Sequence, residues 1–176
     1  MTSIIFKKPP RKAADRRRFM RSNLFPDIPE EELWLRKKKV GFTTIPRTMS
    51  LIGRIQDHLS EKGFPLSGTY LTLWCWVFDE GFLEIRNPKE FAFESGFTGP
   101  RAEATWKNRM LRLESLGFIK AKEGLSGPFH NVVLLDPVRV IQKIYDARPH
   151  DLHYGVFFSR LTQIGANDIA VEESEE

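Results

Sequence analysis

The segment from Pro88 to Phe118 constrains the fold of this 176-residue chain more than any other. Its pattern predicts a short helix over about residues 89–95, a tight turn, and a longer helix. Ala92 and Gly96 stand four residues apart, which puts a small residue where two helices touch and a glycine where the chain turns at positive φ. The sequence therefore predicts a helix-turn-helix here.

The longer helix has two faces when its residues are placed at about 100° intervals. The apolar face predicts a core stripe, consisting of Ala102, Trp106, Met110 and Leu113, with Leu116 at its edge. The opposite face consists of Arg101, Ala104, Thr105, Asn108, Arg112 and Ser115. Arginine pairs bidentately with guanine, asparagine pairs with adenine, and small side chains let a helix approach base edges. The composition of this face is typical either of a helix that contacts bases in the major groove of DNA or of an ordinary solvated surface.

A hairpin is predicted directly after this helix. Gly117 ends the helix and a strand begins at Phe118, with Lys120 and Lys122 on one side of it. Residues 124–130 are predicted to form a loop with Gly127-Pro128 at its tip, and an apolar run over 131–135 is predicted to be the returning strand.

This order of elements, with the run Leu113-Glu-Ser-Leu-Gly-Phe-Ile119, resembles the winged-helix superfamily. The resemblance covers about residues 66–136 and implies a mainly α fold with a small β-hairpin, with a recognition helix over 99–116 and a wing over 120–132. It implies double-stranded DNA as the partner, although some winged helices bind proteins instead. The run from 45 to 74 also resembles small proteins of bacterial mobile elements and plasmids.

The site residues follow from this resemblance and from the helix face. The residues expected to contact bases and flanking phosphates are Arg101, Thr105, Asn108 and Arg112. Backbone contacts are assigned to Lys107 and Arg109, and wing contacts with phosphates or the minor groove to Lys120, Lys122 and His130.

Charge is distributed unevenly along the chain. Residues 1–48 hold 13 Lys and Arg against 5 Asp and Glu, a net charge of +8, whereas residues 149–176 hold 1 against 6, a net charge of −5. This asymmetry suggests a polyanionic partner for the N-terminal part. Residues 1–22 are predicted to be a disordered basic arm in which Arg16, Arg17 and Arg18 contact phosphates, the alternative being a solubilising tail.

The remaining segments are predicted to extend this core. Residues 23–47 are predicted to be a linker with one short helix, which begins at three glutamates and ends at the basic cluster 36–39. The winged-helix domain is expected over 48–148, with helices over 48–62 and 69–85 before the helix-turn-helix. Residues 149–176 are expected to hold a last helix, which either covers the core or forms a homodimer, and an acidic tail.

No catalytic or metal-binding pattern is evident in the sequence. The four histidines, His58, His130, His150 and His153, do not show metal-ligand spacing with acids, and Cys75 is the single cysteine. We therefore expect no enzyme activity, no metal and no cofactor. No apolar run approaches a membrane span, so a cytoplasmic protein without membrane contact is expected. The predicted function is transcription regulation, with replication or partition of a plasmid or mobile element, or a protein-interaction subunit, as alternatives.

Overall fold

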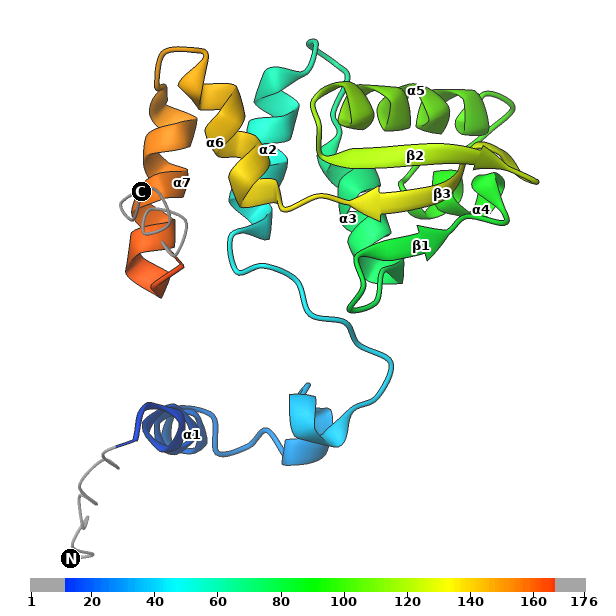
Figure 1. Cartoon of the computed structure of the whole chain (residues 1–176). Coiled ribbons are helices and arrows are strands. Elements are labelled where there is room, and N and C mark those ends of the chain that lie inside the picture. Colours follow the sequence, from blue (N-terminus) through cyan, green and yellow to red (C-terminus); the bar gives the residue numbers. More distant parts are fainter. Residues whose placement is uncertain (1–11, 167–176) are drawn as a thin grey trace, which may run out of the picture. The chain divides into compact units, whose positions relative to one another are not determined.

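The computed structural model describes residues 12–166, which form mostly helices and one small sheet (Figure 1). The chain divides into two compact units, Met1–Phe42 and Thr43–Glu176, and each is described by itself. The first unit contains α1 (Ala13–Leu24) and two 3₁₀ turns, η1 (Glu30–Glu32) and η2 (Arg36–Lys38).

The second unit holds the remaining helices and all three strands of the described range. Its helices are α2 (Met49–Leu59), α3 (Ser67–Trp76), α4 (Pro88–Glu94), α5 (Ala102–Ser115), α6 (Pro137–Asp146) and α7 (Leu152–Ile164). Its strands are β1 (Phe82–Glu84), β2 (Ile119–Gly124) and β3 (Gly127–Leu134). The expected mainly helical fold with a small β-structure is confirmed at this level.

The first unit differs from the prediction of a disordered arm and one short helix. Ala13–Leu24 forms a helix, α1, in which no residue is buried. The expected helix after it is replaced by the two separate 3₁₀ turns, because the strand-like backbone of Leu33 and Leu35 interrupts it. The carboxylate of Glu30 links α1 to η2, because it accepts hydrogen bonds from Arg21 of α1 and Lys38 of η2. Residues 1–11 of the predicted arm, and residues 167–176 of the predicted acidic tail, lie outside the described residues.

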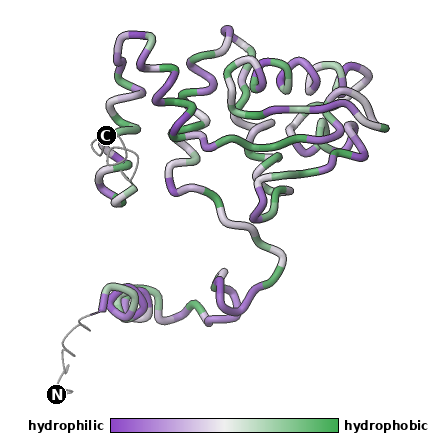
Figure 2. Tube along the Cα trace, viewed as in Figure 1, coloured by the Kyte–Doolittle hydropathy of each residue, from purple (hydrophilic) through white to green (hydrophobic). Residues whose placement is uncertain are grey.

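The core of the second unit forms around the apolar face of α5. Trp106, Met110 and Leu113 have no exposed surface, as the predicted stripe requires. Their burial follows from helical spacing, which brings residues three and four apart onto one face. The C-terminal half of β3 is a hydrophobic stretch in Figure 2, and its Val132 is fully buried in the same core.

The sheet is antiparallel with strand order β1-β3-β2. Leu83 pairs with Val132, and Val132 pairs with Ala121, so this row faces the core. The prediction of one helix over 69–85 is wrong, since α3 ends at Trp76 and the chain adds β1 to the edge of β3. A three-residue strand is too short to show an alternating pattern, and its pairing with β3 stabilises it.

The hairpin is longer and tighter than predicted. Gly124 pairs with Gly127, so residues 125–126 alone form the turn and Leu125 is fully exposed at its tip. Gly127 takes a φ of 114°, which favours glycine, and begins β3 rather than marking the middle of a loop.

The last helix expected within residues 149–176 is present as α7, and α6 precedes it. Asp136 and Asp151 cap them, each accepting a hydrogen bond from a backbone N–H two or three residues further on. Phe157 and Leu161 of α7 are buried, so one face of this helix covers the core. Within residues 12–166, no helix combines the length and the apolar character that a membrane span requires.

Candidate nucleic-acid interface

The corner between α4 and α5 matches the predicted helix–turn–helix geometry. Ala92 is fully buried and accepts a hydrogen bond at its carbonyl from the Phe97 N–H at 3.0 Å. Gly96 lies between them with a φ of 89°, a conformation that strains any residue with a Cβ. This turn positions α5, whose helix begins at Ala102 with Arg101 at its N-cap.

Part of the predicted face of α5 is open to solvent. Arg101 and Asn108 are exposed and Thr105 is half-buried. Their side chains make no hydrogen bond or ion pair with another residue of the described range. Ala104 is exposed between them, so nothing bulky separates these polar groups from an approaching surface. The side chains are therefore available to a partner.

Arg109 does not contribute to this face, contrary to the predicted backbone contact. Its side chain is 7% exposed, and its guanidinium lies 3.3 Å from the centroid of the Phe64 ring. Its Nε donates a hydrogen bond to the Pro65 carbonyl at 2.9 Å. Burial lowers the pKa of Arg109 from its ordinary high value. The residue fastens α5 to the connection between α2 and α3.

Arg112 is also turned away from the predicted base contact. Its Nη2 donates a hydrogen bond to the carbonyl of Leu59, the last residue of α2, at 2.7 Å. Carbonyls at a helix C-terminus lack partners within the helix and carry partial negative charge, so they attract a guanidinium. Arg112 therefore stabilises the end of α2, which corrects its assignment to DNA bases.

Lys107 is half-buried and pairs with Glu103 one turn earlier, with 2.7 Å between Nζ and Oε1. An exposed pair at this spacing contributes only a few tenths of a kcal/mol to a helix, roughly 0.3–0.5. Because such a pair exchanges partners easily, Lys107 stays a candidate for a phosphate contact beside the free residues of α5.

The hairpin presents Lys120 and Lys122 on the face of the sheet that points away from the core. Both are exposed, and neither forms an ion pair with a described residue. Lys122 is paired with Asn131, and Asn131 in turn with Glu84, across the three strands. Lys120 and Lys122 therefore lie on one side of β2, as predicted. Glu84 of β1 adds an acid to the row of Lys122 and Asn131.

His130 is not available as the predicted wing contact. It is 8% exposed, and its Nδ1 lies 2.8 Å from the Ser126 hydroxyl while its Nε2 lies 3.1 Å from Glu84. Its ring fills the space above Gly124, where an added Cβ would collide with the ring. The Arg86 guanidinium holds the pKa of Glu84 below its usual range. His130 therefore packs the hairpin together.

The three arginines predicted for the basic arm lie on α1. Arg16, Arg17 and Arg18 are exposed, and Arg18 is 3.8 Å from Asp15 within the same helix. They belong to the first unit, separate in the chain from α5 and the hairpin.

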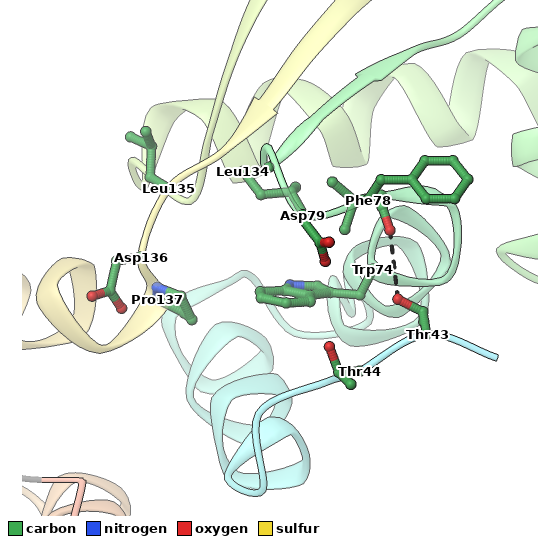
Figure 3. A pocket seen from close by; sticks show the side chains of 11 residues that line it. Thr43, Thr44, Trp74, Phe78, Asp79, Leu134, Leu135, Asp136 and Pro137 are labelled. Atoms are coloured by element: carbon green, nitrogen blue, oxygen red, sulfur yellow. Dashed lines mark hydrogen bonds between the residues drawn. The ribbon is translucent and has the colours of Figure 1, made fainter. Parts of the chain in front are cut away.

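A cavity of about 230 Å³ opens beside Trp74 in the second unit (Figure 3). The Thr43 hydroxyl closes one side by donating to the Val77 carbonyl at 3.5 Å. The indole N–H of Trp74 has no partner among the described residues. The lining is mostly apolar, with Asp79 and Asp136 as its acids, so this cavity adds no cation to the candidate interface.

Two further groupings of side chains lie outside the predicted interface. Exposed aromatic side chains come from the end of α3, from the connection that follows it, from β1 and from α4, namely Trp76, Phe78, Phe82 and Phe93. The structure also brings His58 and His153 together around Asp151, although no ligand spacing was evident in the sequence. Residues 58 and 151 are 93 positions apart, so only the packing of α7 on α2 could reveal this cluster.

Comparison with family models, with curated proteins and with solved structures gives no match for this chain. Its function is therefore argued from its own residues.

Proposed function

We propose that the protein binds double-stranded DNA through α5 and the β2–β3 hairpin. The observation that carries the proposal is the open face of α5, where Arg101 and Asn108 are exposed and have no partner within the described range. These are side chains that read guanine and adenine edges in the major groove. A plain solvated helix face is the alternative, and the experiments below distinguish the two.

The proposed interface has two kinds of contact. Arg101, Thr105 and Asn108 would meet base edges, since α5 presents them with small neighbours that permit close approach. Lys120 and Lys122 would meet phosphates, where a flexible cation gives affinity without base discrimination. The order α3, β1, α4, α5, β2, β3 supports a winged-helix arrangement of these parts.

The arginines of α1 would add sequence-independent affinity. Arg16, Arg17 and Arg18 are exposed on a helix that buries no residue. Neutralising phosphates with such cations releases counterions and makes binding strongly dependent on salt. We infer a cytoplasmic regulator of transcription, with a replication or partition protein of a mobile element as the alternative role.

Selection of duplexes from a random pool by the full-length protein tests the proposal. The retained DNA is sequenced after binding at low and at near-physiological salt. A common motif would support sequence-specific recognition, and a palindromic motif would indicate a homodimer. Retention without a motif would reduce the proposal to non-specific binding, and no retention at low salt would refute it.

Arg101→Ala is the sharpest variant for this interface. We expect it to weaken binding to the selected site by about 1–3 kcal/mol and to relax the sequence preference at one position, as removal of a bidentate base contact does. Arg160→Ala on α7 removes the same charge from another exposed surface and serves as the matched control. Equal losses in both variants would mean that net charge, not recognition by α5, drives the binding.

A protein-interaction subunit is the second candidate, because of the exposed aromatic residues. Phe78 is 86% exposed and Phe93 70% exposed, which is unusual for large apolar side chains. Trp76 connects α3 to α4 by donating its indole N–H to Glu94 at 2.6 Å. Sedimentation of the wild type and of Phe78→Ser and Phe93→Ser tests the simplest case, in which the surface binds a second copy; a mass unchanged by the substitutions would exclude that case.

A further inference from the structure

Three potential metal ligands meet where α7 packs on α2. His58 lies in the last turn of α2, Asp151 caps α7, and His153 is the second residue of α7. One ligand atom from each of the three side chains can be chosen so that all three lie within 4.8 Å of one another. Nothing in the proposed DNA interface uses these residues.

The distances within the cluster are close to those of a metal centre. Nε2 of His58 is 3.0 Å from Oδ2 of Asp151, and Nδ1 of His153 is 3.8 Å from Oδ1. Ligand atoms about 2.0–2.2 Å from a tetrahedral Zn²⁺ are separated by roughly 3.3–3.5 Å. The observed separations lie on both sides of this value, and the two nearly parallel rings would have to rotate out of their stack to direct both nitrogen lone pairs at one ion.

The carboxylate of Asp151 is already oriented by the protein. Its Oδ1 accepts the Tyr154 backbone N–H at 3.0 Å, and its Oδ2 accepts the Tyr145 hydroxyl at 2.9 Å. Hydrogen bonds of this kind fix the direction of a ligand and are typical of the surroundings of metal sites. The same two oxygens lie 3.0 Å from His58 and 3.8 Å from His153.

The two imidazoles are placed side by side and are accessible. The rings of His58 and His153 stack with their centroids 4.2 Å apart and an angle of 20° between their planes. The side chains of His58, His153 and Asp151 are 39%, 31% and 28% exposed. A metal ion can therefore enter from solvent, and water can occupy the coordination position that the protein leaves open.

We propose that His58, Asp151 and His153 form a binding site for a divalent transition-metal ion, Zn²⁺ in particular. Two nitrogen ligands and one oxygen ligand suit Zn²⁺, Ni²⁺ or Co²⁺, whereas Mg²⁺ and Ca²⁺ prefer oxygen ligands alone. Three protein ligands and one open position are a coordination set that Zn²⁺ commonly adopts. The ion would join α7 to α2 across the contact that already holds the last helix in place.

Metal titration of the full-length protein, freed of any affinity tag and of bound metal, tests this site. We expect one equivalent of Zn²⁺ to bind and the melting temperature to rise with its concentration, since a ligand of the folded state stabilises it by mass action. Co²⁺ should give an absorption band in the visible region, which reports its coordination geometry directly. Mg²⁺ at the same concentration should change neither reading.

The variants decide whether these residues are the ligands. His58→Gln and His153→Gln should each lower the Zn²⁺ affinity at least tenfold and abolish the Co²⁺ band. Tyr145→Phe should lower the affinity about tenfold by removing the hydroxyl that orients Asp151. His150→Gln is the matched control, because this histidine lies next to Asp151 in sequence but outside the cluster, and it should bind as the wild type does.

The circular dichroism spectrum of each variant, recorded without metal, shows whether the fold is retained. Absence of saturable Zn²⁺ binding in the wild type would overturn the proposal. Binding that persists in both His58→Gln and His153→Gln would place the metal elsewhere and overturn it equally. A Zn²⁺-dependent slowing of amide exchange in α7, present in the wild type and absent in His58→Gln, would support it.

Discussion

The arginines of α1 and those of α5 with its N-cap residue Arg101 are used in different ways. On α1, Arg16, Arg17 and Arg18 remain on the surface of a helix that buries none of its residues. On α5, Arg109 and Arg112 are directed back into the fold, and Arg101 alone stays open. The number of basic residues on a helix is therefore a poor measure of the charge that it presents to a partner.

The difference follows from what surrounds each helix. Arginine buries its aliphatic stem along apolar surface and reaches carbonyls several ångströms from its Cα. α5 lies beside the connection between α2 and α3, which offers the Phe64 ring and the carbonyls of Leu59 and Pro65. Within the described range α1 buries no residue, so Arg16, Arg17 and Arg18 stay exposed while Arg21 pairs with Glu30.

The largest effect in this comparison is expected for Arg109→Ala. The substitution removes a desolvated cation–π contact and a charged hydrogen bond, so it should lower the free energy of unfolding by about 3 kcal/mol. Urea unfolding followed by circular dichroism measures it. Arg109→Lys keeps the charge but loses the planar stacking, so its free energy of unfolding should lie between those of the wild type and Arg109→Ala. A loss below about 1 kcal/mol for Arg109→Ala would show that the buried guanidinium is not a structural contact.

A smaller effect is expected for Arg112→Ala. This side chain is half-buried and its hydrogen bond to Leu59 caps α2, so we expect a loss of about 1 kcal/mol in the free energy of unfolding. Arg101→Ala on the same helix should change that free energy by less than about 0.5 kcal/mol, as for other free surface residues. Equal losses for the two variants would contradict the division of α5 into structural and open arginines.

No change in stability is expected when Arg16, Arg17 and Arg18 are replaced together by alanine. The melting temperature of the second unit should stay as in the wild type, because α1 buries no residue. The slope of log affinity for DNA against log salt should become shallower by up to about 2.7 if all three contact phosphates. Replacement of the same three residues by lysine keeps the charge and should preserve the slope. An unchanged slope in the alanine variant would remove α1 from the DNA interface.

Local patterns predicted the parts of the fold that depend on neighbours in sequence. The apolar stripe of α5 and the turn at Gly96 were predicted correctly, and so was the last helix, α7. Strand β1 was missed because its three residues acquire strand structure only by pairing with β3, about fifty positions further on. The prediction for His130 failed for a related reason, since the ring packs over Gly124 inside a tighter hairpin than the glycines suggested.

The sequence by itself determined the helix pair α4 and α5, where Gly96 turns the chain, and which face of α5 enters the core, because these follow from the spacing of apolar residues and the freedom of glycine. The tertiary structure alone decided which polar side chains remain free. Spacing fixes the direction of a Cβ atom, but the neighbours brought by packing determine where a long side chain ends. That is why Arg101 stays open and Arg112 does not, and why His58 and His153 meet at Asp151.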